Sequence, residues 1–226
     1  MSPFLDPVTI AAFHDDGAVV IRGMFDDWVD ELAAGIVRNE AEPSEFFSEN
    51  VRDGELGRFW DDYCNWQRIP EFERFIRESK VASIAGELMQ SEIVQLFHDH
   101  VLVKDGGTAT PTPWHSDSPY YFVEGMQTVS VWLPLGQVDH ATLRLIKGSH
   151  RWEHDVLPVR WLAGDDFYPD VNEYLPVPDP DAEPGKFEVL EWALEPGDAV
   201  AFHYRTVHGA RGTAIGDSAR RAFSVR

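Results

Sequence analysis

The chain has 226 residues, of which 43% are hydrophobic and 12% aromatic, so it can bury a sizeable core and is not disordered. Its 39 acidic residues against 19 basic ones give a formal net charge of −20, which argues against binding to nucleic acid or to an anionic membrane surface. A single cysteine, Cys64, excludes an internal disulfide and a cysteine-based zinc cluster.

Targeting signals are absent from the sequence pattern. The first ten residues show no basic start followed by an apolar run, and no stretch approaches the roughly eighteen apolar residues that span a bilayer. We therefore expect a cytoplasmic protein. The length fits one domain over residues 1–226, because no internal repeat or low-complexity linker divides the chain.

Helical spacing dominates the first part of the chain, over about residues 1–92. The segment 13–23 predicts the end of a helix, a turn at Asp16-Gly17 and a short strand of β-branched residues. Apolar residues then recur at helical spacing over residues 28–40 and again over residues 70–90. We expect these helices to cover one sheet of the part that follows.

From Ile93 onward the pattern changes to short strands separated by glycine, proline and aspartate turns. The expected strands are residues 93–104, 128–135, 142–146, 187–192, 199–203 and 220–225. Many short strands of this kind predict a mainly β protein with flanking helices, whose core over about residues 93–226 is a jelly-roll or cupin-like barrel. The proline- and aspartate-rich segment at about 157–185 interrupts the strands, and a loop of this length is typical of a functional lid.

The segment Pro113-Trp114-His115-Ser116-Asp117 carries the strongest chemical signal. Residues two apart in an extended segment project to the same side, so His115 and Asp117 can bind one ion together. His208 lies 91 residues after Asp117 (208 − 117), just after a predicted strand, and can supply a third ligand. Two imidazoles and one carboxylate on one face leave the opposite face open, as in mononuclear non-haem Fe(II) enzymes. Taken alone, a His-x-Asp pair in so acidic a chain is explained more simply by a solvated turn.

Two adjacent arginines begin the last predicted strand. Alternation along a strand sends Arg220 and Arg221 to opposite faces, so one of them must face the barrel interior. An arginine buried there calls for an anionic partner. The bidentate fork of arginine suits the distal carboxylate of a co-substrate that has two carboxylates. The pair therefore indicates an anion-binding position near the metal.

The order of these motifs resembles a known family. His115-Ser116-Asp117, the later His208-Gly209 and the run Arg220-Arg221-Ala222 resemble the phytanoyl-CoA dioxygenase family of Fe(II)/2-oxoglutarate oxygenases. Segments between them are also similar to family strands, namely residues 101–104, 129–135, 143–151 and 195–199. The resemblance runs from about Phe13 to the last residue, and the ordered set is far more specific than any one motif.

The resemblance implies a double-stranded β-helix fold and a decarboxylating use of 2-oxoglutarate and O2 that releases succinate and CO2. Carried over by position, the iron ligands are His115, Asp117 and His208, and the residues that contact 2-oxoglutarate are Arg220, Trp132 and His100. Family members that halogenate have a small residue in place of the aspartate. Asp117 therefore favours hydroxylation or a related oxidation of a small-molecule substrate.

Three departures from the family pattern stand out. Ala210 replaces a small polar residue that often contacts the co-substrate, so one hydroxyl contact is expected to be missing. Residues 139–142 lack the Asn-Gly turn that is common before the Leu-Arg strand. The sequence reaches Arg226 within a predicted strand where relatives usually continue, so we expect either a trimmed chain or a barrel edge that is completed differently.

Two other functions stay open on the sequence. One is a catalytically silent barrel that binds a small ligand or a metal. The other is a zinc hydrolase that uses the same ligands, although this leaves the inward arginine unexplained and supplies no obvious general base. The aromatic run at Tyr120, Tyr121 and Phe122 fits a substrate-pocket wall and ordinary core packing equally well. The sequence names neither the substrate nor the oligomeric state.

Overall fold

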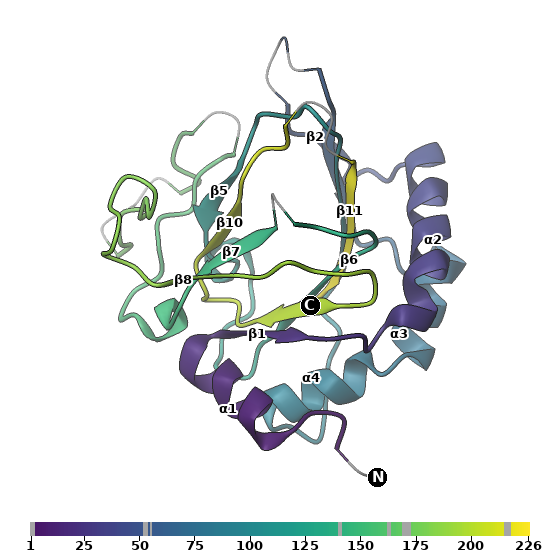
Figure 1. Ribbon diagram of the computed structural model, residues 1–226, viewed down its shortest axis with the longest axis horizontal. Helices are drawn as coiled ribbons and strands as arrows, with labels where there is room; N and C mark the ends of the chain where they lie inside the picture. The colour runs from purple at the N-terminus through teal and green to yellow at the C-terminus, as the bar shows by residue number, and fades with distance from the viewer. Residues whose placement is uncertain are drawn as a thin grey trace.

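Two antiparallel β-sheets face each other in the computed structural model, with helices beside the larger sheet (Figure 1). The structure describes residues 3–51, 54, 56–139, 142–161, 164–168, 173–214 and 218–226. The architecture is a mainly β double-stranded β-helix with flanking helices, as the sequence predicted. No helix in these described ranges is long and apolar enough to cross a membrane.

The larger sheet has seven strands in the order β1-β9-β6-β11-β4-β3-β2. Their bounds are β1 (Ala18–Ile21), β2 (Ser48–Glu49), β3 (Phe59–Tyr63), β4 (Asp99–Lys104), β6 (Ser130–Pro134), β9 (Ala199–Phe202) and β11 (Arg220–Val225). The smaller sheet has four strands in the order β5-β10-β7-β8. Their bounds are β5 (Thr112–His115), β7 (Leu143–Ile146), β8 (Val189–Glu191) and β10 (His208–Ala210).

The N-terminal part contributes strands as well as helices. The helices are α1 (Pro7–Asp16), α2 (Val29–Ala41), α3 (Pro70–Glu78) and α4 (Val81–Met89), and the 3-10 helices are η1 (Asp26–Trp28), η2 (Ser118–Tyr120) and η3 (Ser149–Arg151). The helical spacing over residues 70–90 corresponds to two helices, α3 and α4, because the chain is extended at Ser79 (φ −77°, ψ 176°). The Ser79 hydroxyl accepts a hydrogen bond from the Val81 N–H (3.2 Å), which favours a new helix start over continuation.

Strand β3 was not predicted, because its sequence FWDDY contains two aspartates, which are depleted in strands. The buried Asp62 carboxylate finds hydrogen-bond donors inside the fold. It accepts hydrogen bonds from the Asn39 side-chain amide (2.8 Å) and from the Ser44 N–H (2.8 Å). The other aspartate of this strand, Asp61, faces the barrel interior.

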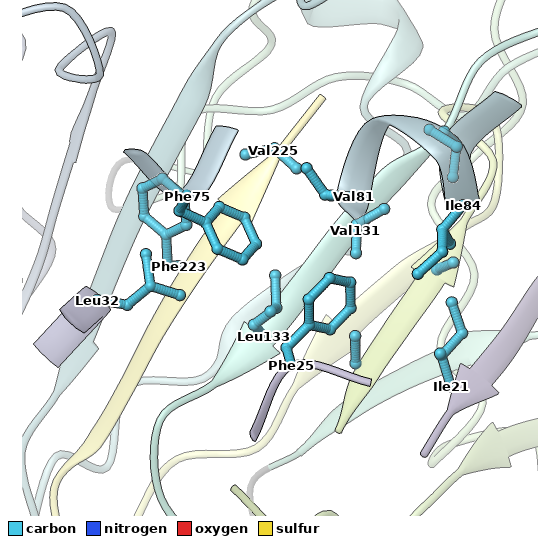
Figure 2. Close-up of a cluster of buried hydrophobic side chains, with 14 of the residues drawn as sticks. Ile21, Phe25, Leu32, Phe75, Val81, Ile84, Val131, Leu133, Phe223 and Val225 are labelled. Carbon is cyan, nitrogen blue, oxygen red and sulfur yellow. The ribbon is translucent and has the colours of Figure 1, made fainter. Parts of the chain in front are cut away.

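The hydrophobic core lies between the helices and the larger sheet (Figure 2). Phe25, Leu32 and Phe75 from the helical layer pack in one cluster with Leu133 and Phe223 of the sheet. Because side chains alternate along a strand, the neighbours of these sheet residues point to the other face, into the barrel. The core thus determines which residues of β6 and β11 line the interior.

Strand β11 illustrates this alternation. Phe223 is fully buried against the helices, whereas Arg220 is buried on the opposite face and Arg221 is exposed. The prediction that one of the two arginines faces the interior is therefore confirmed, and the residue is Arg220. The stretch 139–142, which lacks the Asn-Gly turn of the family pattern, contains His140 and Ala141, and these two lie outside the described residues.

Gly17 joins helix α1 to the segment that leads into strand β10. Its left-handed backbone (φ 81°) ends the helix, and its carbonyl accepts hydrogen bonds from the His203 N–H (2.9 Å) and the Thr206 hydroxyl (2.7 Å). A methyl group there would overlap the His150 ring and the Thr206 hydroxyl.

We expect Gly17→Ala to lower the free energy of unfolding by at least about 1–2 kcal/mol, the cost of the left-handed backbone alone. Urea unfolding measures this loss. Gly136→Ala is the matched control, because no atom lies within 4 Å of a methyl group at Gly136. Equal stability of the two variants would contradict the assigned role of Gly17.

Candidate metal centre

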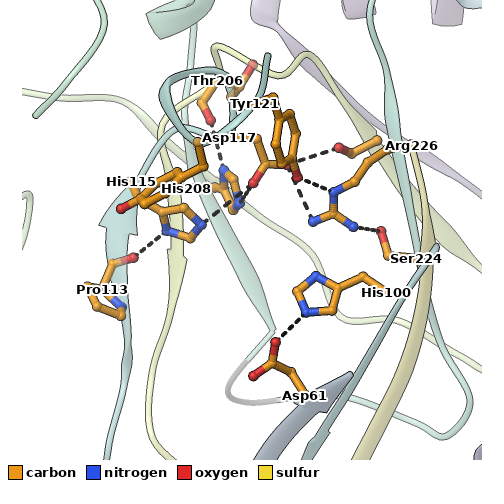
Figure 3. Close-up of polar contacts among 12 residues, drawn as sticks. Asp61, His100, Pro113, His115, Asp117, Tyr121, Thr206, His208, Ser224 and Arg226 are labelled. Atoms are coloured by element: carbon orange, nitrogen blue, oxygen red, sulfur yellow. Dashed lines mark hydrogen bonds and ion pairs between the residues drawn. The ribbon is translucent and has the colours of Figure 1, made fainter. Parts of the chain in front are cut away.

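Strand pairing brings the two predicted histidine ligands together. β5 ends at His115 and β10 begins at His208, and the antiparallel register places these two residues opposite each other. Their ring centroids are 4.2 Å apart. Asp117 follows β5 in a turn that is fixed by a hydrogen bond from its N–H to the Tyr204 carbonyl (2.8 Å). One ligand atom from each of the three residues lies within 4.8 Å of the others (Figure 3).

Hydrogen bonds fix the tautomer of both imidazoles. His115 donates through Nδ1 to the Pro113 carbonyl (2.8 Å), and His208 donates through Nδ1 to the Thr206 carbonyl (2.9 Å). Each Nε2 therefore presents its lone pair toward Asp117 Oδ1, at 3.8 Å from His115 and 3.9 Å from His208. Burial lowers the pKa of His115 to about 3 and also lowers that of His208, so both rings are neutral at pH 7. This donor set fits a divalent metal ion.

The carboxylate of Asp117 is held so that one oxygen faces the histidines. Its other oxygen, Oδ2, accepts a hydrogen bond from the Ser130 hydroxyl (3.1 Å) and lies 3.4 Å from Nη2 of Arg226. Burial raises the pKa of Asp117, but the positive charge of Arg226, aided by the hydrogen bond from Ser130, outweighs it and holds this pKa well below its usual range. The structure thus presents an ionised, single-oxygen ligand.

Arg226 is a functional-site residue that the sequence interpretation missed. Its side chain is 6% exposed, and it donates from Nε to the Tyr121 hydroxyl (2.6 Å) and from Nη1 to the Ser224 hydroxyl (3.0 Å). Its backbone N–H donates to the His98 carbonyl (2.9 Å). This hydrogen bond continues the pairing of β11 with β4 by one residue beyond the end of β11. The missed signal was alternation, because residues 220, 222, 224 and 226 share one face of a strand.

A cavity of about 800 Å³ opens onto the three ligands. Arg220, Trp132 and His100 also line it, so the structure brings all the predicted site residues to one space. The Arg220 guanidinium lies 5.7 Å from the centre of the Trp132 ring. Burial lowers the pKa of Arg220 to about 10, so this buried side chain still carries its charge at pH 7.

The aromatic run after the metal motif forms part of the cavity wall. Tyr120, Tyr121 and Phe122 all line the cavity and are not ordinary core. Asp61 lines it too and contacts His100, whose Nε2 lies 2.8 Å from Asp61 Oδ2 (Figure 3). This aspartate was missed because strand β3 was not predicted.

The described part of the segment 157–185 contacts the turn that carries Asp117. The Tyr120 hydroxyl donates to the Val159 carbonyl (2.8 Å) and accepts from its N–H (2.9 Å). The Trp161 ring lies 5.1 Å from the His115 ring, centre to centre. Tyr168 donates to the Pro119 carbonyl (2.7 Å). Residues 162–163 and 169–172 of this segment lie outside the described residues.

His203 lies in the segment between β9 and β10 and is held there by hydrogen bonds. It is 2% exposed, accepts at Nδ1 from the Arg205 N–H (3.1 Å) and donates from Nε2 to the Met126 carbonyl (3.1 Å). Burial lowers its pKa from 6.5 to about 4. The unfolded chain therefore binds more protons than the folded chain between these two values, and stability falls as the pH falls through this window.

We expect His203→Gln to reduce the pH dependence of stability, because the variant lacks the one group at this position whose pKa differs between the folded and the unfolded chain. Between about pH 6 and pH 4.5, the unfolding free energy of the metal-free variant should fall less steeply than that of the parent, by up to ~1.4 kcal/mol per pH unit. Urea unfolding over this pH range measures both slopes. Parallel slopes would contradict a neutral, buried His203.

The fold and the two-histidine, one-carboxylate cluster define a class of metal-dependent barrel proteins, and comparison with known proteins specifies it. A family model described as phytanoyl-CoA dioxygenase (PhyH) matches residues 13–222. The chain belongs to this family, and the resemblance inferred from its sequence motifs is confirmed. No curated protein is similar enough in sequence to match the chain.

Solved structures with the same fold are similar over nearly the whole chain. The non-heme alpha ketoglutarate dependent carbocyclase SnoK from nogalamycin biosynthesis is 22% identical, with a TM-score of 0.75 over 100% of this chain and 86% of that one. AviO1 from Streptomyces viridochromogenes Tue57 is 20% identical, with a TM-score of 0.71 over 100% and 95%. EctD from S. alaskensis, solved with 2-oxoglutarate and 5-hydroxyectoine, is 21% identical, with a TM-score of 0.72 over 99% and 76%. At these identities the likeness establishes the fold.

Proposed function

We propose that this chain is an Fe(II)- and 2-oxoglutarate-dependent dioxygenase that oxidises a small-molecule substrate. The observation that carries the proposal is the cluster of His115, Asp117 and His208, which opens onto the cavity that Arg220 also lines. Metal ligands alone would fit several reactions. A buried arginine in the same cavity adds a position for an anionic co-substrate.

The three ligands would hold Fe(II) through Nε2 of His115, Nε2 of His208 and Oδ1 of Asp117. With 2-oxoglutarate and O2, the bound iron supplies the oxidising power, and succinate and CO2 are released. The protein's own contribution is geometric. The carbonyls of Pro113 and Thr206 keep both Nε2 atoms free of protons, and Ser130 with Arg226 turns Asp117 Oδ1 toward them.

Arg220 would bind the distal carboxylate of 2-oxoglutarate. Its planar guanidinium can form two parallel hydrogen bonds with a carboxylate, and burial makes such a pair strong. Trp132 lies beneath this guanidinium and would form one wall of the co-substrate site. His100 pairs with Ser224, four residue pairs along the β4–β11 ladder from Arg220, and would border the co-substrate from the side.

The lid would exclude water from the reacting centre. Tyr120 and Tyr168 connect the described lid residues to the metal-bearing turn, and Trp161 lies against His115. Exclusion of water strengthens the electrostatic contacts inside the cavity. We include in the proposal that residues 1–226 act as one domain with this segment as its lid.

Among the possible outcomes, we propose hydroxylation. Asp117 occupies a ligand position that a halide would need, which argues against halogen transfer. Relatives with this fold include a carbocyclase and an epimerase, so placement of the substrate determines the outcome. Once a substrate that the protein converts is known, the mass of its product distinguishes these reactions. Of hydroxylation, ring closure and epimerisation, only hydroxylation adds one oxygen atom.

The proposal is tested by the formation of succinate from 2-oxoglutarate. We expect iron-dependent succinate release by the protein supplied with Fe(II), 2-oxoglutarate and O2, and none when Zn(II) replaces Fe(II) or in His208→Ala. Activity with Zn(II) toward ester or amide substrates would support a zinc hydrolase instead. Absence of succinate under all conditions would support a silent barrel.

A further inference from the structure

The mouth of the cavity is rich in aromatic side chains. We define the aromatic vestibule as Phe46, Tyr63, Phe97, Phe122, Trp161 and Phe167, all of which line the cavity. Phe46 stacks on Tyr63 with ring centres 5.0 Å apart, and Phe97 packs edge-on against Phe122 at 5.2 Å. Phe122 is 91% exposed, and Phe46, Tyr63 and Phe167 are also exposed. Apolar side chains of the cavity lining are therefore open to solvent. Exposed apolar patches next to a cavity mark ligand-binding surfaces.

The charges around this vestibule are unfavourable for anions. Among the described residues that line the cavity, the basic side chains are Arg220 and Arg226, and both are buried. Arg226 already contacts Asp117 and Tyr121. Glu45 adds a carboxylate to the lining, and the whole chain has a formal net charge of −20. A substrate that carries phosphate or carboxylate groups would be repelled on approach.

One polar pair, Asp61 and His100, also lines the cavity. Asp61 is held by a hydrogen bond from the Asn50 side-chain amide, and its other oxygen lies 2.8 Å from His100 Nε2. Because a carboxylate only accepts hydrogen bonds, His100 donates through Nε2, and in the neutral ring Nδ1 is left as an acceptor. In Figure 3 this second nitrogen lies on the side of the ring toward Asp117 and Tyr121. The pair thus offers a substrate one oriented acceptor.

We infer that the prime substrate is an uncharged or cationic ring compound that donates an O–H or N–H hydrogen bond to His100 Nδ1 while its ring packs in the aromatic vestibule. This inference rests on the proposed function, because it assigns the substrate of the same site. Asp61 acts through His100 as a positioning residue. The same charges disfavour thioesters of coenzyme A and phosphorylated compounds as substrates.

The test uses four naphthalene probes that share one ring body. These are 2-naphthylmethanol, 2-naphthylmethylamine, the methyl ether of the alcohol, and 2-naphthoate. Anaerobic calorimetry with the full chain, Fe(II) and 2-oxoglutarate gives the Kd of each. We expect the alcohol and the amine to bind at least about tenfold more tightly than 2-naphthoate, and the alcohol about tenfold more tightly than its ether.

Variants then assign the hydrogen bond. In His100→Phe the ratio of ether Kd to alcohol Kd should fall to about one, whereas a merely structural role would weaken both probes together. In Asp61→Asn the new amide would donate to His100 Nε2, so Nδ1 would carry the proton and the ratio should fall as well. His154→Phe is the matched control, since its side chain is 52% exposed.

Tightest binding of 2-naphthoate would overturn the inference, as would a ratio that His100→Phe leaves unchanged. Failure of all four probes to bind at millimolar concentration would also overturn it. The visible charge-transfer band of the iron–2-oxoglutarate complex, recorded in the same samples, tests the proposed function separately. A failure of the substrate assignment is thereby distinguished from a failure of the iron and co-substrate assignment.

Discussion

Asp117→Ala is expected to abolish iron binding and also to destabilise the metal-free protein by roughly 3–5 kcal/mol. The first effect follows from loss of a ligand. The second follows because Arg226, whose side chain is 6% exposed, loses its charged partner and keeps, among the described residues, hydrogen bonds to the neutral hydroxyls of Tyr121 and Ser224. Stability is measured by urea unfolding with a chelator present, and iron binding by anaerobic calorimetry.

The double variant Asp117→Ala/Arg226→Met separates the two effects. Replacing both members of a buried ion pair by apolar groups is often neutral or stabilising, so most of the lost stability should return while iron binding stays absent. Arg221→Met is the matched control, because the Arg221 side chain is exposed at the start of the same strand. A double variant as unstable as Asp117→Ala would contradict the ion pair.

The second large effect is expected at the co-substrate position. Arg220→Gln should raise the KM for 2-oxoglutarate by about 30-fold or more, the cost of removing one partner from a buried, charge-paired contact. Iron binding without co-substrate should be unchanged, since Arg220 contacts none of the three ligands in the described hydrogen bonds and ion pairs. Succinate formation at varied 2-oxoglutarate concentration gives the KM.

Arg221→Gln provides the control for this substitution. It removes the same charge from the neighbouring position, but its side chain is exposed on the outer face of the sheet. Its KM for 2-oxoglutarate should therefore match that of the parent protein. Equal effects of the two substitutions would show that general charge, and not a buried carboxylate contact, governs co-substrate binding.

The sequence predicted the parts of the site that depend on local pattern. Alternation placed His115 and Asp117 on one side of an extended segment and one of two arginines inside the barrel. Strands with a clear apolar face, such as β6 and β11, were also predicted. The order of motifs supplied His208, which local pattern alone leaves as one of several histidines.

The remaining parts depend on contacts between segments far apart in the chain. Asp61 meets His100 across strands β3 and β4, and β3 carries two aspartates that favour a turn in sequence terms. Arg226 meets Asp117 only because β11 runs past the metal-bearing turn. The break at Ser79 depends on one side-chain hydrogen bond, which competes with helix continuation.

The assignment of the iron and co-substrate sites is tested most directly by an anaerobic titration of the protein with Fe(II) and then 2-oxoglutarate, followed by visible absorption. We expect a charge-transfer band that saturates at one iron and one co-substrate per chain. The band should be lost in His208→Ala and should need far more 2-oxoglutarate in Arg220→Gln than in Arg221→Gln. A protein that binds Fe(II) but forms no such band at any 2-oxoglutarate concentration would contradict this assignment.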